Sequence, residues 1–228
     1  MRSISSHLTY AFFLFLYDYE MSLISGSDPA RMLILGEGGT GKSEIIKAIT
    51  LYFQKTKRLH TLRLTAPTGT AAANIFGITI HGLLHLMSSS QNFAKIQSAL
   101  SEVTCLVVDE CGFLGLDTLF KIDSTLSQIR SSTLPFGGFN ILFLGDFYQV
   151  RPVKSLPLYA SDSDINKSKG KPRFHTYIGG QKAWKNISTV IFLIKNYRTV
   201  DPVYQGMLTR LRQGSFSVID YNLLMVCQ

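Results

Sequence analysis

Residues 36–43 read GEGGTGKS and match every fixed position of the phosphate-binding pattern G-x-x-x-x-G-K-[ST]. In such a loop the glycines turn backbone N–H groups towards a polyphosphate, and the dipole of the following helix adds a positive end. Lys42 is expected to reach the β- and γ-phosphates, and the Ser43 hydroxyl to ligate Mg²⁺. The residues predicted to bind the nucleotide are Gly36, Gly38, Gly39, Thr40, Gly41, Lys42 and Ser43. The alternative is a glycine turn that holds no ligand.

Two adjacent carboxylates follow an apolar run further along the chain. Residues 105–110 read CLVVDE, which predicts a strand that ends at Asp109 and Glu110. In a phosphate-loop protein, Asp109 at that place would hold Mg²⁺ and Glu110 would polarise the attacking water. A later apolar run, residues 141–144, is followed by Gln149, which could contact the γ-phosphate or orient the water. Gln149 could equally be a loop residue in a turn begun by Gly145 and Asp146.

Three further features have both a functional and a structural interpretation. The turn Pro67-Thr68-Gly69, in TAPTGTAA, offers N–H groups and hydroxyls suited to a phosphodiester backbone, or is only a helix cap. His81 could contact nucleic acid or could be structural. Arg198 follows the last apolar run, where it could face the γ-phosphate or be an ordinary surface charge.

The elements that must position these residues alternate along the chain. Apolar runs typical of buried parallel strands occupy residues 32–35, 62–66, 105–108, 141–144 and 190–194. Helical patterns occupy residues 43–54, 69–76, 80–87, 116–130 and 202–212. This alternation predicts an α/β fold with a mainly parallel, doubly wound sheet, in which ligands bind beyond the carboxyl ends of the strands. The polar residues 161–173 are expected to form an exposed loop.

The composition fits a folded protein with anionic partners. The 228 residues are 46% hydrophobic and 17% charged, with a formal net charge of +8. That charge favours nucleic acid, nucleotide or an acidic surface, although a generically basic protein is also compatible with it. Three cysteines without metal-ligand spacing fit a reduced intracellular compartment. The apolar residues 8–17 are too few to span a bilayer, so we expect a packed helix there, with a targeting segment or a misassigned gene start as alternatives.

Taken together, the motifs identify a family resemblance. The chain resembles the PIF-one-like branch of superfamily-one DNA helicases, which is related to RecD, from about residue 31 to about residue 214. The resemblance rests on the order and spacing of GEGGTGKS, TAPTGTAA, ITIHGLL, VVDEC, PFGGFNILFLGDFYQVRPV and NYRT before LTRLRQG. It implies a RecA-like P-loop domain that uses ATP and Mg²⁺ to move along single-stranded DNA and to unwind duplex in the 5′-to-3′ direction.

The resemblance also implies roles for single residues and for the whole protein. Lys42 and Ser43 would bind nucleotide and Mg²⁺, Asp109 the metal and Glu110 the water. Gln149 and Arg198 would contact the γ-phosphate, whereas the turn at Pro67, Thr68 and Gly69 and His81 would lie along the DNA. The implied partners are single-stranded DNA and duplex junctions, without a membrane. The implied roles are DNA repair, recombination and telomere maintenance, in the nucleus of a eukaryote or in mitochondria.

Some positions depart from the family pattern. The glutamine that usually precedes the phosphate loop and reads adenine has no counterpart, because the first glutamine is Gln54. We expect residues 1–30 to be an N-terminal segment, 31–214 the ATP-binding lobe and 215–228 a truncated end, with the second RecA-like lobe absent or supplied by a partner chain. Two other hypotheses remain: a non-catalytic nucleotide- and DNA-binding remnant of a mobile-element helicase, and an unrelated phosphate-loop enzyme such as a nucleotide kinase.

Overall fold

A parallel β-sheet forms the centre of the computed structural model, which describes residues 6–84, 93–199 and 201–226. Its strands in these ranges lie in the order β3-β2-β4-β5-β1-β6, and every neighbouring pair is parallel. Their bounds are β1 Arg31–Gly36, β2 Leu62–Ala66, β3 Ile78–Thr79, β4 Cys105–Val108, β5 Asn140–Gly145 and β6 Thr189–Leu193. All residues of β4 and β5 are buried, as expected for central strands of a sheet covered on both faces.

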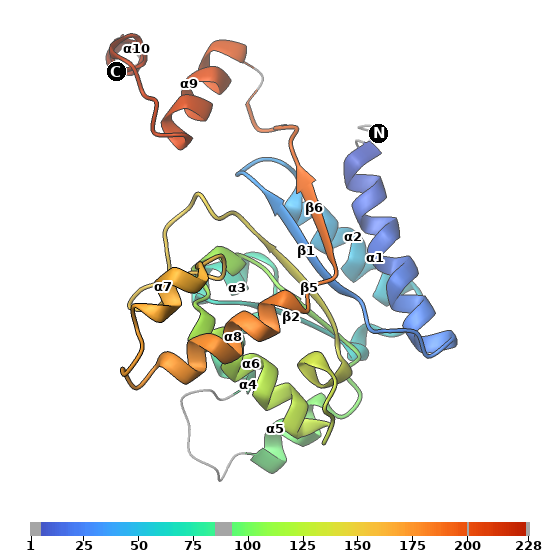
Figure 1. Ribbon diagram of the computed structural model, residues 1–228. Coiled ribbons are helices and arrows are strands. Elements are labelled where there is room, and N and C mark those ends of the chain that lie inside the picture. Colours follow the sequence, from blue (N-terminus) through green and yellow to red (C-terminus); the bar gives the residue numbers. More distant parts are fainter. Residues whose placement is uncertain (1–5, 85–92, 200, 227–228) are drawn as a thin grey trace.

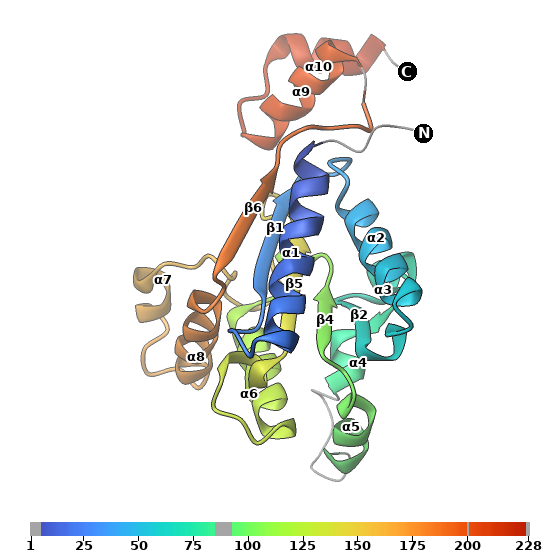
Figure 2. The same ribbon diagram turned by 90° about the vertical axis from the view of Figure 1, so that its right-hand side faces the viewer.

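Helices cover both faces of the sheet (Figures 1 and 2). One core packs α1 (Ser6–Ile24) and α2 (Lys42–Lys55) on the sheet, and the other packs α4 (Ile80–Leu84), α5 (Phe93–Leu100), α6 (Leu116–Ile129) and α8 (Phe174–Lys185). The remaining helices are α3 (Gly69–Asn74), α7 (Asp162–Asn166), α9 (Pro202–Arg212) and α10 (Val218–Val226). Figure 1 shows α9 and α10 beyond the carboxyl end of β6, away from the sheet.

The structure confirms the predicted fold class and the five predicted strands, each within about one residue of its expected bounds. The predicted helices that begin near residues 43, 69, 80, 116 and 202 are also present, although residues 85–87 of the third lie outside the described residues. Four helices, α5, α7, α8 and α10, and the two-residue strand β3 were not predicted.

The prediction of an exposed loop over residues 161–173 was wrong for its first part. Helix α7 occupies Asp162–Asn166, and Ile165 is buried. Ser161 and Asp164 form a capping box, in which the Ser161 hydroxyl accepts the N–H of Asp164 and the Asp164 carboxylate accepts the N–H of Ser161. The polar composition concealed a short helix that its own caps stabilise.

The apolar N-terminal residues form α1. Its residues Ala11, Phe15, Leu16 and Tyr19 are buried against α2 and the sheet. Among the residues that the structure describes, no helix combines the length and the apolar character needed to cross a membrane.

Candidate nucleotide-binding site

The phosphate loop connects β1 to α2 at the carboxyl edge of the sheet. Gly39 and Gly41 have φ angles of 91° and 99°, a region that strongly favours glycine. A Cβ at Gly36 would overlap the Thr40 hydroxyl at 2.4 Å, so the loop backbone is closely packed on itself. The Thr40 hydroxyl in turn donates to the Glu37 carbonyl oxygen at 2.8 Å. The sequence therefore forms a rigid turn whose N–H groups lead into the start of α2.

Lys42 lies under this loop rather than in solvent. Its side-chain Nζ donates to the carbonyl oxygens of Gly36 at 2.5 Å and Glu37 at 3.1 Å, and the residue is 8% exposed. Burial lowers the pKa of Lys42, while the nearby carboxylates, Glu110 foremost, oppose that shift. The ammonium group thus has no full counter-charge in direct contact among the described residues. It is placed to bind an incoming anion.

The two carboxylates after β4 differ in their partners. Asp109 is buried and accepts the Glu110 N–H at 2.9 Å. Glu110 adopts a left-handed backbone conformation with φ 52°, and its Oε2 is buried without a hydrogen-bond partner among the described residues. Burial raises the pKa of both carboxyls; repulsion from Asp109 adds to the rise at Glu110, and attraction to Lys42 opposes it. An unpartnered buried carboxylate oxygen of this kind can accept a proton from water.

A third carboxylate, Asp146, joins this cluster from β5. It is 3% exposed, and its negative charge acts on both Lys42 and Glu110. The turns that follow β4 and β5 approach so closely that a Cβ at Gly112 would lie 2.5 Å from the Asp146 carbonyl oxygen. Gly112 and Gly145 therefore allow the two strand ends to bring their acidic side chains together.

An ion pair connects Asp146 to the far end of the chain. The Arg212 guanidinium, at the end of α9, contacts both Asp146 carboxylate oxygens at 2.5 Å. The same guanidinium lies over the Tyr148 ring, 4.3 Å from its centroid. Arg212 thus fixes the position of α9 relative to the strand that precedes Gln149.

Arg198 reaches the phosphate loop from the segment that follows β6. The key residue there is Asn196, whose amide donates to Glu37 Oε1 and to the Gly38 carbonyl oxygen, both at 3.0 Å. The Asn196 side-chain oxygen accepts the Arg198 N–H at 2.9 Å. A Cβ at Gly39 would lie 2.5 Å from the Arg198 Cβ. The exposed Arg198 side chain therefore lies directly against the glycine loop.

The other predicted residues lie at the same edge with fewer contacts. Ser43 is exposed in the first turn of α2. Gln149 is half-buried in the loop after β5 and forms no side-chain hydrogen bond with a described residue. The Leu8 side chain of α1 packs against the phosphate loop, because a Cβ atom added at Gly41 would lie 2.8 Å from it.

The residues predicted to contact DNA follow two neighbouring strands. Pro67, Thr68 and Gly69 come after β2, and Thr68 caps α3 by accepting the Ala71 N–H at 3.2 Å. His81 comes after β3, which pairs with β2, so both groups lie at the carboxyl edge. Gly69 has open space around its Cα. The order of the strands thus places the two groups beside one another.

The environment of His81 is set by α6. Burial lowers the pKa of His81, Lys121 lowers it further, and Asp117 opposes the change. His81 is therefore a half-buried group near α6, compatible with a contact to a polar partner.

Sequence reasoning missed several residues of this site. Glu37, Asn196 and Arg212 lie within the motifs GEGGTGKS, NYRT and LTRLRQG, but they were given no role because they act through contacts between segments distant in sequence. Asp146 carried a signal similar to that of Asp109, an acidic residue at the end of a strand with an apolar run, and could have been found by that signal.

The residues present fit a nucleotide with a divalent cation. The glycines of the phosphate loop keep free the space next to the backbone that Cβ atoms would occupy. Lys42 provides the positive charge for a polyphosphate. Ser43 and Asp109 supply the hydroxyl and carboxylate oxygens that Mg²⁺ prefers. Within the described residues no group of three or more histidine, cysteine or acidic residues is arranged to hold a metal ion.

An all-parallel sheet with a phosphate loop after β1 and an acidic pair after β4 defines the RecA-like class of P-loop domains. Comparison with solved structures agrees. The Pif1 helicase from Candida albicans superposes with a TM-score of 0.72 at 24% identity, over 96% of this chain and 46% of that chain. Pif1 from Bacteroides in complex with ADP-AlF3 and ssDNA gives 0.72 at 21% identity, over 98% of this chain and 49% of that chain. At these identities the likeness concerns the fold alone.

The family follows from sequence comparison. Residues 16–216 match the model of the PIF1-like helicase family, and the chain belongs to that family. It is 31% identical over 192 residues to the ATP-dependent DNA helicase PIF1 of Saccharomyces cerevisiae, covering 79% of this chain and 21% of that protein. The human helicase of the same name is 28% identical over 192 residues, covering 80% of this chain and 27% of that protein. The chain spans about a fifth to a quarter of the length of these relatives.

Proposed function

We propose that this chain is the ATP-binding lobe of an ATP-dependent DNA helicase. The observation that carries the proposal is the convergence of Lys42, Asp109 and Glu110 beneath the glycine loop, with Glu110 Oε2 buried and unpartnered among the described residues. This arrangement suits phosphoryl transfer from a nucleoside triphosphate to water, in which the protein contributes mainly positioning and electrostatics.

Each side chain has a defined task in this reaction. Lys42 and the loop N–H groups bind and orient the β- and γ-phosphates, and Arg198 and Gln149 face the γ-phosphate. Glu110 accepts a proton from the attacking water, while Asp109 and Ser43 would hold Mg²⁺. When bound, Mg²⁺ neutralises charge on the phosphate oxygens. The raised pKa of Glu110 brings its carboxylate closer to the basicity that a general base needs.

The proposed macromolecular substrate is single-stranded DNA and its junctions with duplex. Three observations support it: the +8 charge, the open turn at Pro67, Thr68 and Gly69 beside His81, and the family membership. The names of the relatives describe ATP-dependent DNA helicases, and a structural neighbour was solved with ssDNA.

Unwinding requires more than the described lobe. The chain covers 46% to 49% of the matched helicase structures, and translocation needs two DNA-binding surfaces that move relative to each other. We therefore infer that a second RecA-like lobe, on the same polypeptide or on a partner chain, completes the motor. Its arginine would add the transition-state contact that Arg198 alone does not supply.

The proposed biological setting follows from the family. Roles in DNA repair, recombination and telomere maintenance are compatible with relatives named PIF1 and RRM3. An intracellular location, nuclear or mitochondrial, agrees with the two buried free cysteines, Cys105 and Cys111.

The test is a strand-displacement assay on a forked duplex, run with the purified chain alone and with a second lobe from a related helicase. The proposal predicts ATP-dependent unwinding only when the second lobe is present, and predicts that Lys42→Ala and Glu110→Gln both abolish it. In that mixture Glu110→Gln should still bind nucleotide. ATP-dependent unwinding by the Glu110→Gln protein at the wild-type rate would refute the assigned chemistry.

A further inference from the structure

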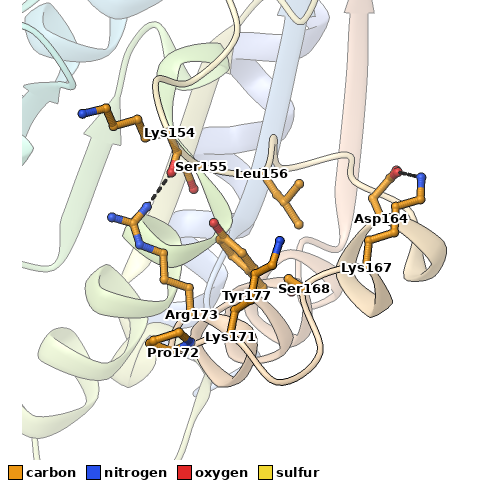
Figure 3. A pocket seen from close by; sticks show the side chains of 10 residues that line it. All are labelled: Lys154, Ser155, Leu156, Asp164, Lys167, Ser168, Lys171, Pro172, Arg173 and Tyr177. Carbon is orange, nitrogen blue, oxygen red and sulfur yellow. Dashed lines mark hydrogen bonds and ion pairs between the residues drawn. The ribbon is translucent and has the colours of Figure 1, made fainter.

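A basic pocket of about 680 Å³ lies between the loop after β5 and helices α7 and α8 (Figure 3). Its lining includes four cationic side chains, Lys154, Lys167, Lys171 and Arg173, and one carboxylate, Asp164. Figure 3 shows Arg173 beside the Lys154 backbone on one side and the Lys167–Asp164 pair on the other, with the Tyr177 ring between them. The pocket is separate from the phosphate loop, and the nucleotide site does not use any of these residues.

Two of the four cations lack a counter-charge. Lys167 pairs with Asp164 at 3.1 Å, and Arg173 pairs with Asp117 at 3.6 Å. Lys154 and Lys171 form no ion pair with a described residue, and both are exposed. The pocket is therefore net positive after its internal pairs are formed, which favours an anionic ligand.

Tyr177 supplies a hydrogen-bond donor to the pocket. The residue is 7% exposed, yet its hydroxyl forms no hydrogen bond with a described residue and it lines the pocket. The Tyr177 hydroxyl is not among the buried polar atoms that lack a partner, so it is accessible from the pocket. A phosphate oxygen in the pocket could accept the Tyr177 O–H while the lysines neutralise its charge.

The pocket adjoins the predicted DNA path through one shared residue. Asp117, in the first turn of α6, accepts a hydrogen bond from Ser155 and pairs with Arg173, and both of these residues line the pocket. His81 lies in α4, whose apolar residues belong to the same hydrophobic core as those of α6, and Asp117 is one of the two charged residues that act on His81. A strand that passes the turn at Pro67 and then His81 would therefore reach the pocket by crossing the start of α6.

We propose that this pocket binds a backbone phosphate of the nucleic-acid strand that passes His81, through Lys154, Lys171 and the Tyr177 hydroxyl. The inference rests on the proposed DNA-binding function and extends it to a second contact on the same lobe. Such a contact carries no sequence information; it fixes the register of the strand on the protein.

The test compares two double variants of the full chain that lose the same charge. Lys154→Gln with Lys171→Gln removes the two unpaired cations of the pocket. Lys47→Gln with Lys55→Gln is the matched control, because both lysines are exposed on α2, on the opposite face of the sheet. Fluorescence anisotropy with a single-stranded oligonucleotide at several salt concentrations measures affinity. Relative to the control, the pocket variant should bind about tenfold more weakly at low salt, with a salt slope smaller by about 0.7, the value for one lost phosphate contact.

Tyr177→Phe tests the pocket without changing charge or packing. It should weaken binding about tenfold or more, which corresponds to one lost hydrogen bond to a charged group. Nucleotide affinity serves as the check that each variant is folded, and it should equal that of the wild type. If Tyr177→Phe and the pocket double variant both bind the strand as the control does, the pocket inference is wrong.

Two further outcomes separate this inference from the proposed function. If the wild type binds no strand at any salt concentration, the DNA part of the proposed function fails and the inference falls with it. If the wild type binds DNA and the pocket variant loses only affinity for inorganic phosphate, measured by calorimetry, the pocket is a site for free phosphate and the inference alone is overturned.

Discussion

Arg212 and Asp146 are 66 positions apart in sequence and form an ion pair through two contacts of 2.5 Å. The Asp146 side chain is 2% exposed, and the Arg212 side chain 25%. Asp146 also belongs to the acidic cluster around Lys42 and Glu110. The pair therefore connects α9, which lies beyond the sheet in Figure 1, directly to the proposed catalytic edge.

Replacing Arg212 by alanine should leave a buried carboxylate without its partner and cost about 3 kcal/mol of stability. Hydrogen exchange should become faster in α9 and also around Asp146. Arg210→Ala is the control, because Arg210 pairs with Asp220 in the first turn of α10 and its loss leaves the Asp146 contact intact. In a double-mutant cycle, Asp146→Asn should remove most of the Arg212→Ala penalty. Equal exchange around Asp146 in the two arginine variants would show that the ion pair does not hold α9 to the site.

Asn196→Ala should separate Arg198 from the phosphate loop. The change removes the hydrogen bonds to Glu37 and Gly38 and the acceptor of the Arg198 N–H. We expect a loss of about 1–2 kcal/mol in stability and about a tenfold loss of nucleotide affinity. Asn186→Ala is the matched control, since it loses one exposed hydrogen bond to the Lys182 carbonyl oxygen far from the loop. Calorimetric titration with nucleotide distinguishes the two variants, and equal affinity would contradict the role given to Asn196.

Glu110→Gln should make the ligand-free protein more stable at neutral pH. Burial raises the pKa of Glu110 above its ordinary value, so the folded state favours the protonated form. The contribution of Glu110 is then favourable below the unfolded pKa and is lost as pH rises through the folded pKa. The variant should therefore melt at a higher temperature than the wild type at pH 7, with a smaller difference at pH 4. Glu102→Gln, an exposed residue, controls for the loss of one charge. A Glu110→Gln protein less stable than the wild type at pH 7 would contradict this account.

Local patterns predicted the parts of the fold that local forces determine. The strands β4 and β5 are continuous apolar runs because both faces of each are covered, and such runs are readable in the sequence. The strand β3 has only two residues and depends on pairing with β2, so it has no pattern of its own. Helix α7 was missed because its polar residues resemble a loop, although Ser161 and Asp164 carried a capping signal.

The residues of the candidate site also fall into two groups: those that local sequence patterns predict and those whose roles depend on tertiary contacts. Lys42, Asp109 and Glu110 were predictable because each directly follows an apolar strand or its glycine loop. Asn196 and Arg212 were not, because their roles come from contacts made only after β6 and α9 pack against the sheet. The lack of a hydrogen-bond partner for Glu110 Oε2 among the described residues likewise depends on three-dimensional packing.

The most direct test of the central claim is the affinity of the chain for Mg²⁺-ATP with and without the Lys42 ammonium group. Lys42→Ala removes charge-assisted contacts to the phosphates, and the expected loss of about 1.5–3 kcal/mol corresponds to about a ten- to hundredfold weaker complex. Lys47→Ala, an exposed lysine of the same helix that pairs with Glu44, should bind nucleotide as the wild type does. Equal affinity of the wild type and Lys42→Ala would show that the glycine loop is not the nucleotide-binding site of this protein.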